Sequence, residues 1–180
     1  FPMRGPLAAT PDMYKLTGDR AVGNFGWPGV VDNANLEGFQ SIATPGAVAG
    51  LCEAHKLFGR LPLREVIAPA VQLAREGYAA NWYRVYGIGQ QIGKLLKYKE
   101  LRHIFLPGDE MPSVDLINPA VIRNTELASV LEVIGRDGPS AFYEGDIAKA
   151  IVFDVQQNGG VLSEEDLRSY RPFVWESGLE

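Results

Sequence analysis

Apolar residues recur at helical spacing in the first half of the chain, and turn-forming residues divide this pattern into two consecutive predicted helices. The first is expected to begin at Thr44-Pro45, where a capping hydroxyl precedes a proline whose missing N–H has no helical partner to lose. Gly59 is expected to end it by turning into the left-handed region. The second is expected to begin at Pro62 and to end at Gly77.

The two predicted helices each carry an apolar face, and the sequence favours packing of one face on the other. On the second helix the apolar positions follow an i, i+3, i+4, i+7 pattern, which places them on one stripe. The residues expected to be buried together are Val66, Ile67, Ala70 and Val71 on the second helix, with Leu51 and Phe58 on the first.

Three more helices are predicted further along the chain. Asn81 is expected to cap one, and either Asn124 or Thr125 the next. The third spans about residues 146–157. Between the first two, residues 97–118 form a charged connection that prolines interrupt.

The predicted ends of the chain are less regular. Ser163 to Asp166 resembles a capping box in which aspartate replaces the usual glutamate, so a short helix is expected there. Residues 173–175 are expected to begin a strand. Prolines favour an extended segment over residues 1–14, and residues 15–40 form a glycine-rich loop with a turn at Trp27-Pro28-Gly29.

Composition indicates a globular protein of one domain: 180 residues, 46% hydrophobic and 22% charged. A net charge of −5 argues against nucleic acid or an anionic membrane as a partner. No apolar run approaches the ~20 residues that a membrane span needs, and no signal segment is expected at Phe1. Cys52 is the single cysteine, which excludes an internal disulfide and a cysteine metal cluster, and its helical position favours a small buried apolar group.

Candidate chemistry is sparse. His55 and His103 are far apart in sequence with no nearby carboxylate pattern, so no metal site is expected. His55 lies on an apolar helix face, whereas His103 is expected at the surface. The string Y-G-I-G-Q-Q-I-G-K from Tyr86 matches neither nucleotide-binding glycine motif, because the glycine spacing differs and Lys94 is followed by leucine.

Several blocks of the sequence, in one consistent order, closely resemble the large subunit of the gamma-glutamyltransferase (glutathione hydrolase) family. They are A-A-T-P-D-M-Y from Ala8, T-P-G-A-V-A-G from Thr44, F-G-R-L-P-L from Phe58, A-P-A-V-Q-L-A-R-E-G-Y from Ala68, E-L-A-S-V-L-E-V-I-G-R-D-G-P-S-A-F-Y-E-G from Glu126, and N-G-G-V-L-S-E-E-D-L-R-S-Y from Asn158. The resemblance covers nearly the whole chain.

The resemblance implies an α+β fold: residues 1–180 would be a single partial domain, a mostly helical internal segment of the large subunit of an N-terminal nucleophile hydrolase with an αββα sandwich. Members of that class cut themselves once and expose a threonine that attacks an amide. The family's T-T-H cleavage motif is absent here, because none of the chain's threonines lies in such a context. These threonines are Thr10, Thr17, Thr44 and Thr125. The chain alone is therefore expected to be inactive, with no catalytic residue of its own.

The resemblance also implies one substrate-binding residue. In the family an arginine four residues before an A-P dipeptide binds the substrate's alpha-carboxylate, and that position falls on Pro2. Arg4 is two residues later, on the same side of an extended strand, and its guanidinium suits a carboxylate. A solvated arginine near a chain end is the alternative.

The implied function is hydrolysis or transfer of gamma-glutamyl groups from glutathione and related amides, without cofactor or metal. The implied partners are the rest of the large subunit and a small catalytic subunit produced by autoprocessing, together forming a heterodimer. A related amidohydrolase or acylase is an alternative, as is a non-catalytic helical binding module. The family resemblance allows a periplasmic or extracellular location as well as a cytoplasmic one, and the sequence does not choose between them.

Overall fold

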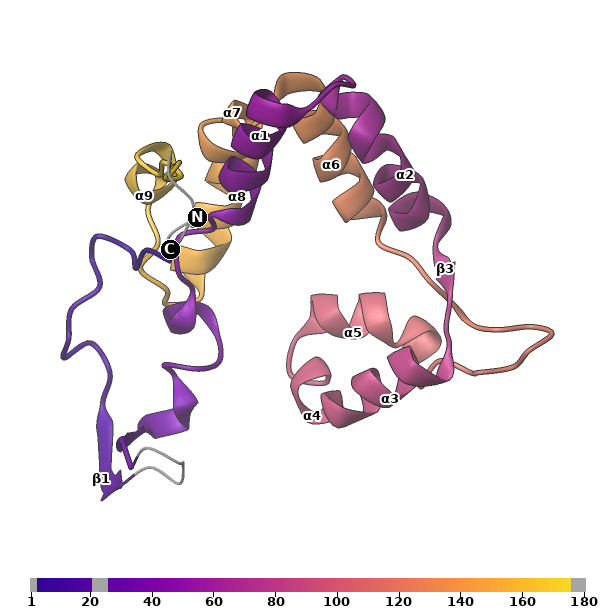
Figure 1. The fold of residues 1–180 in the computed structure, drawn as a ribbon. Coiled ribbons are helices and arrows are strands. Elements are labelled where there is room, and N and C mark those ends of the chain that lie inside the picture. The colour runs from indigo at the N-terminus through magenta and orange to yellow at the C-terminus, as the bar shows by residue number, and fades with distance from the viewer. Residues whose placement is uncertain (1–2, 21–25, 176–180) are drawn as a thin grey trace. The chain divides into compact units, whose positions relative to one another are not determined.

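The computed structural model describes residues 3–20 and 26–175, and the chain divides into two compact units. Unit 1 comprises residues 1–60 and 137–180, and unit 2 comprises residues 61–136. Within the described ranges, helices make up most of the regular structure, and the strands form two small antiparallel sheets (Figure 1). This combination is the α+β class that was predicted.

Unit 1 joins an N-terminal region to the C-terminal helices. Its elements are β1 (Leu16–Arg20), β2 (Pro28–Val30), two 3-10 turns (Val31–Asn33 and Phe39–Ser41), α1 (Ala47–Phe58), α7 (Ser140–Tyr143), α8 (Asp146–Gln157) and α9 (Glu164–Arg168). Strands β1 and β2 pair antiparallel, with Leu16 opposite Val30. The chain returns after residue 136 to complete this unit, so its core combines residues from both ends of the sequence (Figure 1).

The core of unit 1 lies among α1, α7, α8 and α9. It consists of Ala49, Tyr143, Ala148, Val152, Val155, Leu162, Leu167 and Tyr170. Leu162 and Leu167 are fully buried, and each such side chain contributes about 1.5–3 kcal/mol by its removal from water. The Tyr143 and Tyr170 rings stack with centroids 5.9 Å apart. This core holds α9 in place, although an isolated helix of its length is unstable in water.

Unit 2 is a chain of short helices closed by a small sheet. Its elements are α2 (Leu63–Glu76), β3 (Tyr78–Ala79), α3 (Trp82–Gln90), α4 (Ile92–Leu95), α5 (Lys99–Phe105), a 3-10 turn (Pro107–Asp109), β4 (Val121–Ile122) and α6 (Thr125–Asp137). Strands β3 and β4 pair antiparallel, with Tyr78 opposite Ile122. A second core cluster contains Ala80, Ile88, Leu95, Leu106 and Ile122.

Several predicted helix boundaries are confirmed. Helices α2 and α8 lie where the periodicity placed them, whereas α1 begins at Ala47, after Gly46, and not at Thr44-Pro45. Asn81 caps α3 by accepting a hydrogen bond from the Arg84 amide at 3.0 Å. Of the two candidates for α6, Asn124 is the residue whose side chain accepts a backbone bond, from the Leu127 amide at 2.8 Å. The capping box of α9 is complete.

Other local predictions are wrong. Gly59 does end α1, but in an extended conformation with a φ of −68°. Residues 97–118, predicted to be a charged connection, contain the helix α5. Residues 28–29 belong to β2, not to a turn, and no strand is present at residues 173–175. Short segments of weak pattern carry little information on their own conformation.

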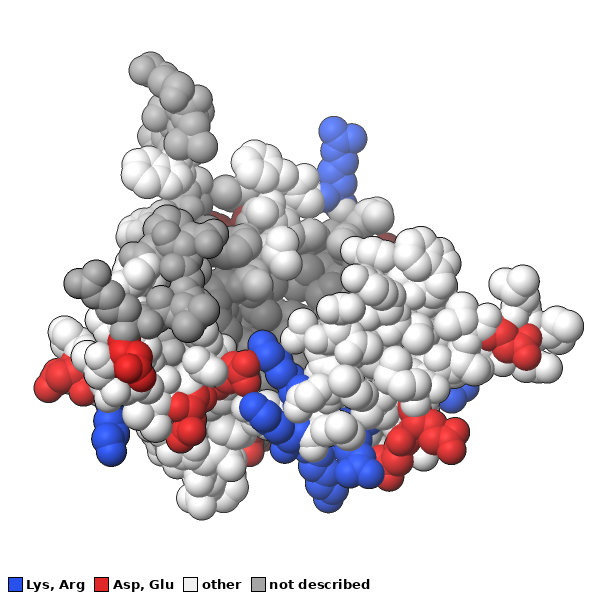
Figure 2. Space-filling model, turned by 90° about the horizontal axis from the view of Figure 1, so that it is seen from below, with Lys and Arg blue, Asp and Glu red and all other residues white. Residues whose placement is uncertain are grey.

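The prediction that the apolar residues of α1 and α2 are buried is wrong for most of them. Val71 is buried, but Val66 is 52% exposed, and Leu51 and Phe58 are 65% and 81% exposed. Ala70 is exposed as well. On the face seen in Figure 2, most acidic and basic side chains lie toward the lower edge of the view, with uncharged side chains above them. Much of the apolar stripe therefore faces outward, although it recurs at helical spacing.

Candidate functional site

Arg4 lies in a junction where residues 4–7 meet Thr44, before α1, and residues 163–169, at α9. It forms an isolated antiparallel bridge with Thr44, whose amide donates to the Arg4 carbonyl at 2.8 Å. The Arg4 side chain is half-buried and donates from Nη1 to the Ser169 carbonyl at 3.4 Å. Arg4 is the one site residue that was predicted from the sequence. Its backbone is held by Thr44, which precedes α1, and its side chain by Ser169, which follows α9.

Asp166 is the charged centre of this junction and is fully buried. Its Oδ1 accepts a 2.6 Å hydrogen bond from the Leu7 amide. Its Oδ2 accepts from the Ser163 amide at 2.8 Å and from the Ser163 hydroxyl at 2.6 Å. Burial by itself raises the pKa of Asp166, but the bonds from Ser163 and Leu7, with the charge of Arg4, outweigh it and hold the pKa below its ordinary value.

Two hydroxyl groups beside Arg4 are buried without a hydrogen-bond partner among the described residues. They are Thr44 Oγ1 and Ser169 Oγ, and the Thr44 residue is only 4% exposed. Buried polar atoms are nearly always paired, since an unpaired one costs about 1–3 kcal/mol. The prediction that the Thr44 hydroxyl caps α1 is therefore wrong. The junction contains polar groups that its own described residues leave unsatisfied.

Tyr143 performs the capping that Thr44 does not. Its hydroxyl accepts from the Ala49 amide, in the first turn of α1, at 3.1 Å and donates to the Pro45 carbonyl at 2.7 Å. Burial raises the pKa of this hydroxyl above its ordinary value, although the bond from Ala49 opposes the shift. Gly46 lies against the side chain of Tyr170, and a Cβ at Gly46 would clash with the Tyr170 hydroxyl oxygen. The start of α1 is thus fixed by tyrosines from distant parts of the sequence.

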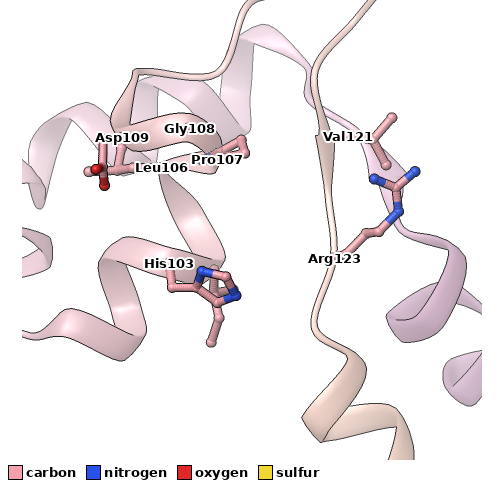
Figure 3. Close-up of a pocket in the computed structure, with 8 residues that line it drawn as sticks. His103, Leu106, Pro107, Gly108, Asp109, Val121 and Arg123 are labelled. Atoms are coloured by element: carbon pink, nitrogen blue, oxygen red, sulfur yellow. The ribbon is translucent and has the colours of Figure 1, made fainter.

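A hollow of about 390 Å³ lies in unit 2, between α5 with its following turn and the strand β4. Figure 3 shows His103 and Asp109 on one side of it and Val121 and Arg123 on the other. Asp109 accepts from Arg102 at 2.7 Å, and Arg123 donates to the Glu76 carbonyl at 2.9 Å. His103 is exposed, as predicted. Asp109 and Arg123 thus bond to neighbouring structure, and the described residues that line the hollow form no acid–base pair.

The remaining residues singled out from sequence do not gather into a site. His55 lies on α1 and is partly exposed. Cys52 is also partly exposed, and burial raises the pKa of its thiol. Pro2 lies outside the described residues. Among residues 3–20 and 26–175, no group of three or more histidine, cysteine, aspartate or glutamate side chains is placed to hold a metal ion. Over the same ranges, no helix combines the length and apolarity that crossing a membrane requires.

Sequence reasoning missed the role of two residues in this junction. The sequence gives no indication that Tyr143 bonds to α1, and for Asp166 it indicates only a cap on its own helix. A signal existed for Asp166, because the shorter aspartate stands where a capping box usually has glutamate. No local signal links Tyr143 to α1, since 94 residues separate it from the amide that it bonds.

Comparison with known proteins gives a consistent result. The family model described as Gamma-glutamyltranspeptidase matches residues 2–177. Glutathione hydrolase 3 of Arabidopsis thaliana is 36% identical over 173 residues, covering 95% of this chain and 24% of that protein. Acylase ACY 1 proenzyme of Pseudomonas sp. (strain V22) is 34% identical over 168 residues, covering 92% of this chain and 28% of that protein.

A solved structure gives the same result for the fold. The chain superposes on the Helicobacter pylori gamma-glutamyltranspeptidase with a TM-score of 0.79 and 30% identity, covering 95% of this chain and 46% of that one. The chain spans about a quarter of the length of the two curated relatives. The similarity therefore extends through both compact units and reaches only part of each relative.

Proposed function

The chain belongs to the gamma-glutamyltranspeptidase family, and from this premise we propose that it is the large-subunit portion of an enzyme that transfers or hydrolyses acyl groups of amides. The donors proposed are gamma-glutamyl compounds such as glutathione. The observation that carries the proposal is the match to the family model over residues 2–177. One continuous match of that extent is far more specific than any short motif.

The nucleophile is proposed to come from outside this chain. An N-terminal nucleophile needs a free alpha-amine beside its hydroxyl, and Thr44, the buried threonine of the junction, lies inside the chain with its amide bonded to Arg4. We therefore propose a small catalytic subunit, released by autoprocessing, as the partner in a heterodimer. The purified chain should not hydrolyse a gamma-glutamyl anilide above the rate without protein. Turnover that survives substitution of every threonine would exclude the family mechanism for this chain.

A second candidate function is acylase activity on the same scaffold. It is favoured by the acylase relative, whose 34% identity is close to the 36% of the glutathione hydrolase. It is also favoured by Pro2, which offers no charge where the family has its carboxylate-binding arginine. Both candidates involve attack on an amide carbonyl and differ in the acyl group bound. Turnover of a gamma-glutamyl anilide compared with an anilide of a simple dicarboxylic acid separates them.

Arg4 is proposed to bind the alpha-carboxylate of the donor. In support, its backbone is held by Thr44 and one of its nitrogens reaches the Ser169 carbonyl at 3.4 Å. A guanidinium has five N–H donors, so further donors are available for a bidentate carboxylate contact. Against it, the charge of Arg4 also contributes to the lowered pKa of the buried Asp166 carboxyl, an interaction that a purely structural arginine would make as well.

The test is Arg4→Lys in an active enzyme that contains this chain. Lysine keeps the charge and loses the fork, so KM for a donor with an alpha-carboxylate should rise by about tenfold, whereas KM for the analogue without it should stay within about twofold. Arg171→Lys is the matched control, because Arg171 is an exposed arginine of the same unit. Equal changes for both donors, or none, would make Arg4 structural and favour the acylase alternative.

A further inference from the structure

Asp166 bonds to more of the molecule than its own helix requires. A capping box needs one carboxylate oxygen to accept from the N-cap residue, and Oδ2 does so for Ser163. The other oxygen, Oδ1, accepts from the amide of Leu7, which lies 159 positions away in the sequence. Asp166 is fully buried, so solvent is not the partner of that oxygen. One oxygen therefore serves the helix, and the other serves the N-terminal segment.

We propose that Asp166 is a positioning residue for substrate binding, which holds residues 4–7 so that Arg4 lies in its binding geometry. The inference rests on the proposed function, because it takes Arg4 as the group that binds the donor's carboxylate. Asp166 would not touch substrate. It acts through the segment that carries Arg4.

The contacts on both sides of this segment support the assignment. At Arg4 the backbone is tied to Thr44 through the 2.8 Å bond from the Thr44 amide, and at Leu7 it is tied to Asp166 at 2.6 Å. The Arg4 side chain reaches the Ser169 carbonyl, the residue directly after α9. The segment is thus contacted at the Leu7 backbone by Asp166 of α9, and at the Arg4 side chain by Ser169, directly after α9.

Replacing the Asp166 carboxylate by an amide would weaken one of the two backbone anchors, because one acceptor oxygen becomes an NH2 donor and the other loses its charge, and it would remove the negative charge that interacts with Arg4. Hydrogen bonds to charged groups are stronger than bonds between neutral groups, so the bond to the Asp166 carboxylate is a strong restraint on the Leu7 backbone. Chemistry at the reacting carbonyl would continue, since no reacting atom is involved. The expected signature is therefore a change in KM for carboxylate-bearing donors with kcat preserved.

A purely structural role for Asp166, as the cap of α9, predicts a different pattern. Ser163→Ala removes the hydroxyl that caps the Asp166 amide and that donates to Oδ2, and it leaves the Leu7 contact intact. Asp166→Asn keeps the shape of the side chain but removes its charge. Glu164→Gln, at an exposed carboxylate on the same helix, is the matched control. Positioning predicts an effect only in Asp166→Asn, whereas capping predicts it in Ser163→Ala as well.

The first measurement is hydrogen exchange at the Leu7 amide in the purified 180-residue chain, which needs no activity. In the unsubstituted chain this amide should be protected, and an exchange rate equal to that of an unstructured peptide would overturn the proposal without any variant. In Asp166→Asn its exchange should be at least about tenfold faster. Ser163→Ala and Glu164→Gln should leave it within about twofold. Faster exchange to the same extent in Ser163→Ala would also overturn it.

The second measurement compares two donors in an active enzyme that contains this chain. In Asp166→Asn, KM for the donor with an alpha-carboxylate should rise by about tenfold with kcat within about twofold, and the donor without it should be unaffected. Equal effects on both donors would overturn the positioning role while the proposed function stands. No turnover of either donor by the unsubstituted enzyme would overturn the proposed function and the positioning role with it.

Discussion

Replacing Tyr143 by phenylalanine would test how the start of α1 is stabilised. The hydroxyl accepts from the Ala49 amide at 3.1 Å and donates to the Pro45 carbonyl at 2.7 Å. Phenylalanine keeps the ring, so its edge contact with Phe142 and its stacking on Tyr170 remain. The substitution therefore removes two hydrogen bonds and little apolar burial.

The magnitude follows from these two bonds. Each contributes about 1 kcal/mol net, and loss of a helix cap alone costs about 0.5–2 kcal/mol. We expect Tyr143→Phe to lower the free energy of unfolding by about 2 kcal/mol. For a chain of 180 residues this corresponds to a fall in Tm of about 4–8 °C.

Urea denaturation gives the change in the free energy of unfolding. Native-state exchange of the Ala49 amide gives the local effect, because that amide loses its acceptor. Tyr86→Phe is the control, since Tyr86 is 63% exposed and should change stability by less than about 0.5 kcal/mol. A loss below about 0.5 kcal/mol in Tyr143→Phe, with unchanged exchange at Ala49, would refute the capping by this tyrosine.

Two further predictions concern the backbone and the response to acid. Gly77→Ala should destabilise the chain by more than about 2 kcal/mol and Gly138→Ala by about 1 kcal/mol. Both glycines have positive φ, but a Cβ would meet neighbouring atoms only at Gly77, where the nearest is Val121 Cγ1 at 2.5 Å. Equal losses of stability in thermal unfolding would contradict this prediction. The Asp166 carboxyl has a lowered pKa in the folded chain, so its contribution to stability should be fully present above the unfolded-state pKa of about 4 and disappear as the pH falls through the folded-state value. Denaturation from pH 6 to about 2 should therefore show a shallower acid decline in Asp166→Asn than in the unsubstituted chain, and parallel declines would contradict it.

The sequence by itself determined the elements whose partners lie within one turn of each other. Helices α2 and α8 follow from apolar spacing with a proline or acidic start and a glycine stop. The cap at Asn81 and the capping box of α9 bond residues only three positions apart, as does the cap of α6, for which the sequence left Asn124 and Thr125 as alternatives. Such contacts depend on local geometry alone, so a pattern in the sequence specifies them. The sequence blocks that resemble the gamma-glutamyltransferase family also occur in the family's order along the chain.

Tertiary structure alone decided where the polar groups of the junction find partners. Tyr143, and not the nearby Thr44, satisfies the first turn of α1, and Asp166 reaches Leu7 across 159 positions. Periodicity carries no information on such pairs, because it reports which face of an element is apolar and not what lies opposite that face. The same limit explains the exposed Leu51 and Phe58. Helical spacing indicates that Leu51 and Phe58 share a face of α1. Their exposure in the folded structure shows that the described residues do not cover this face.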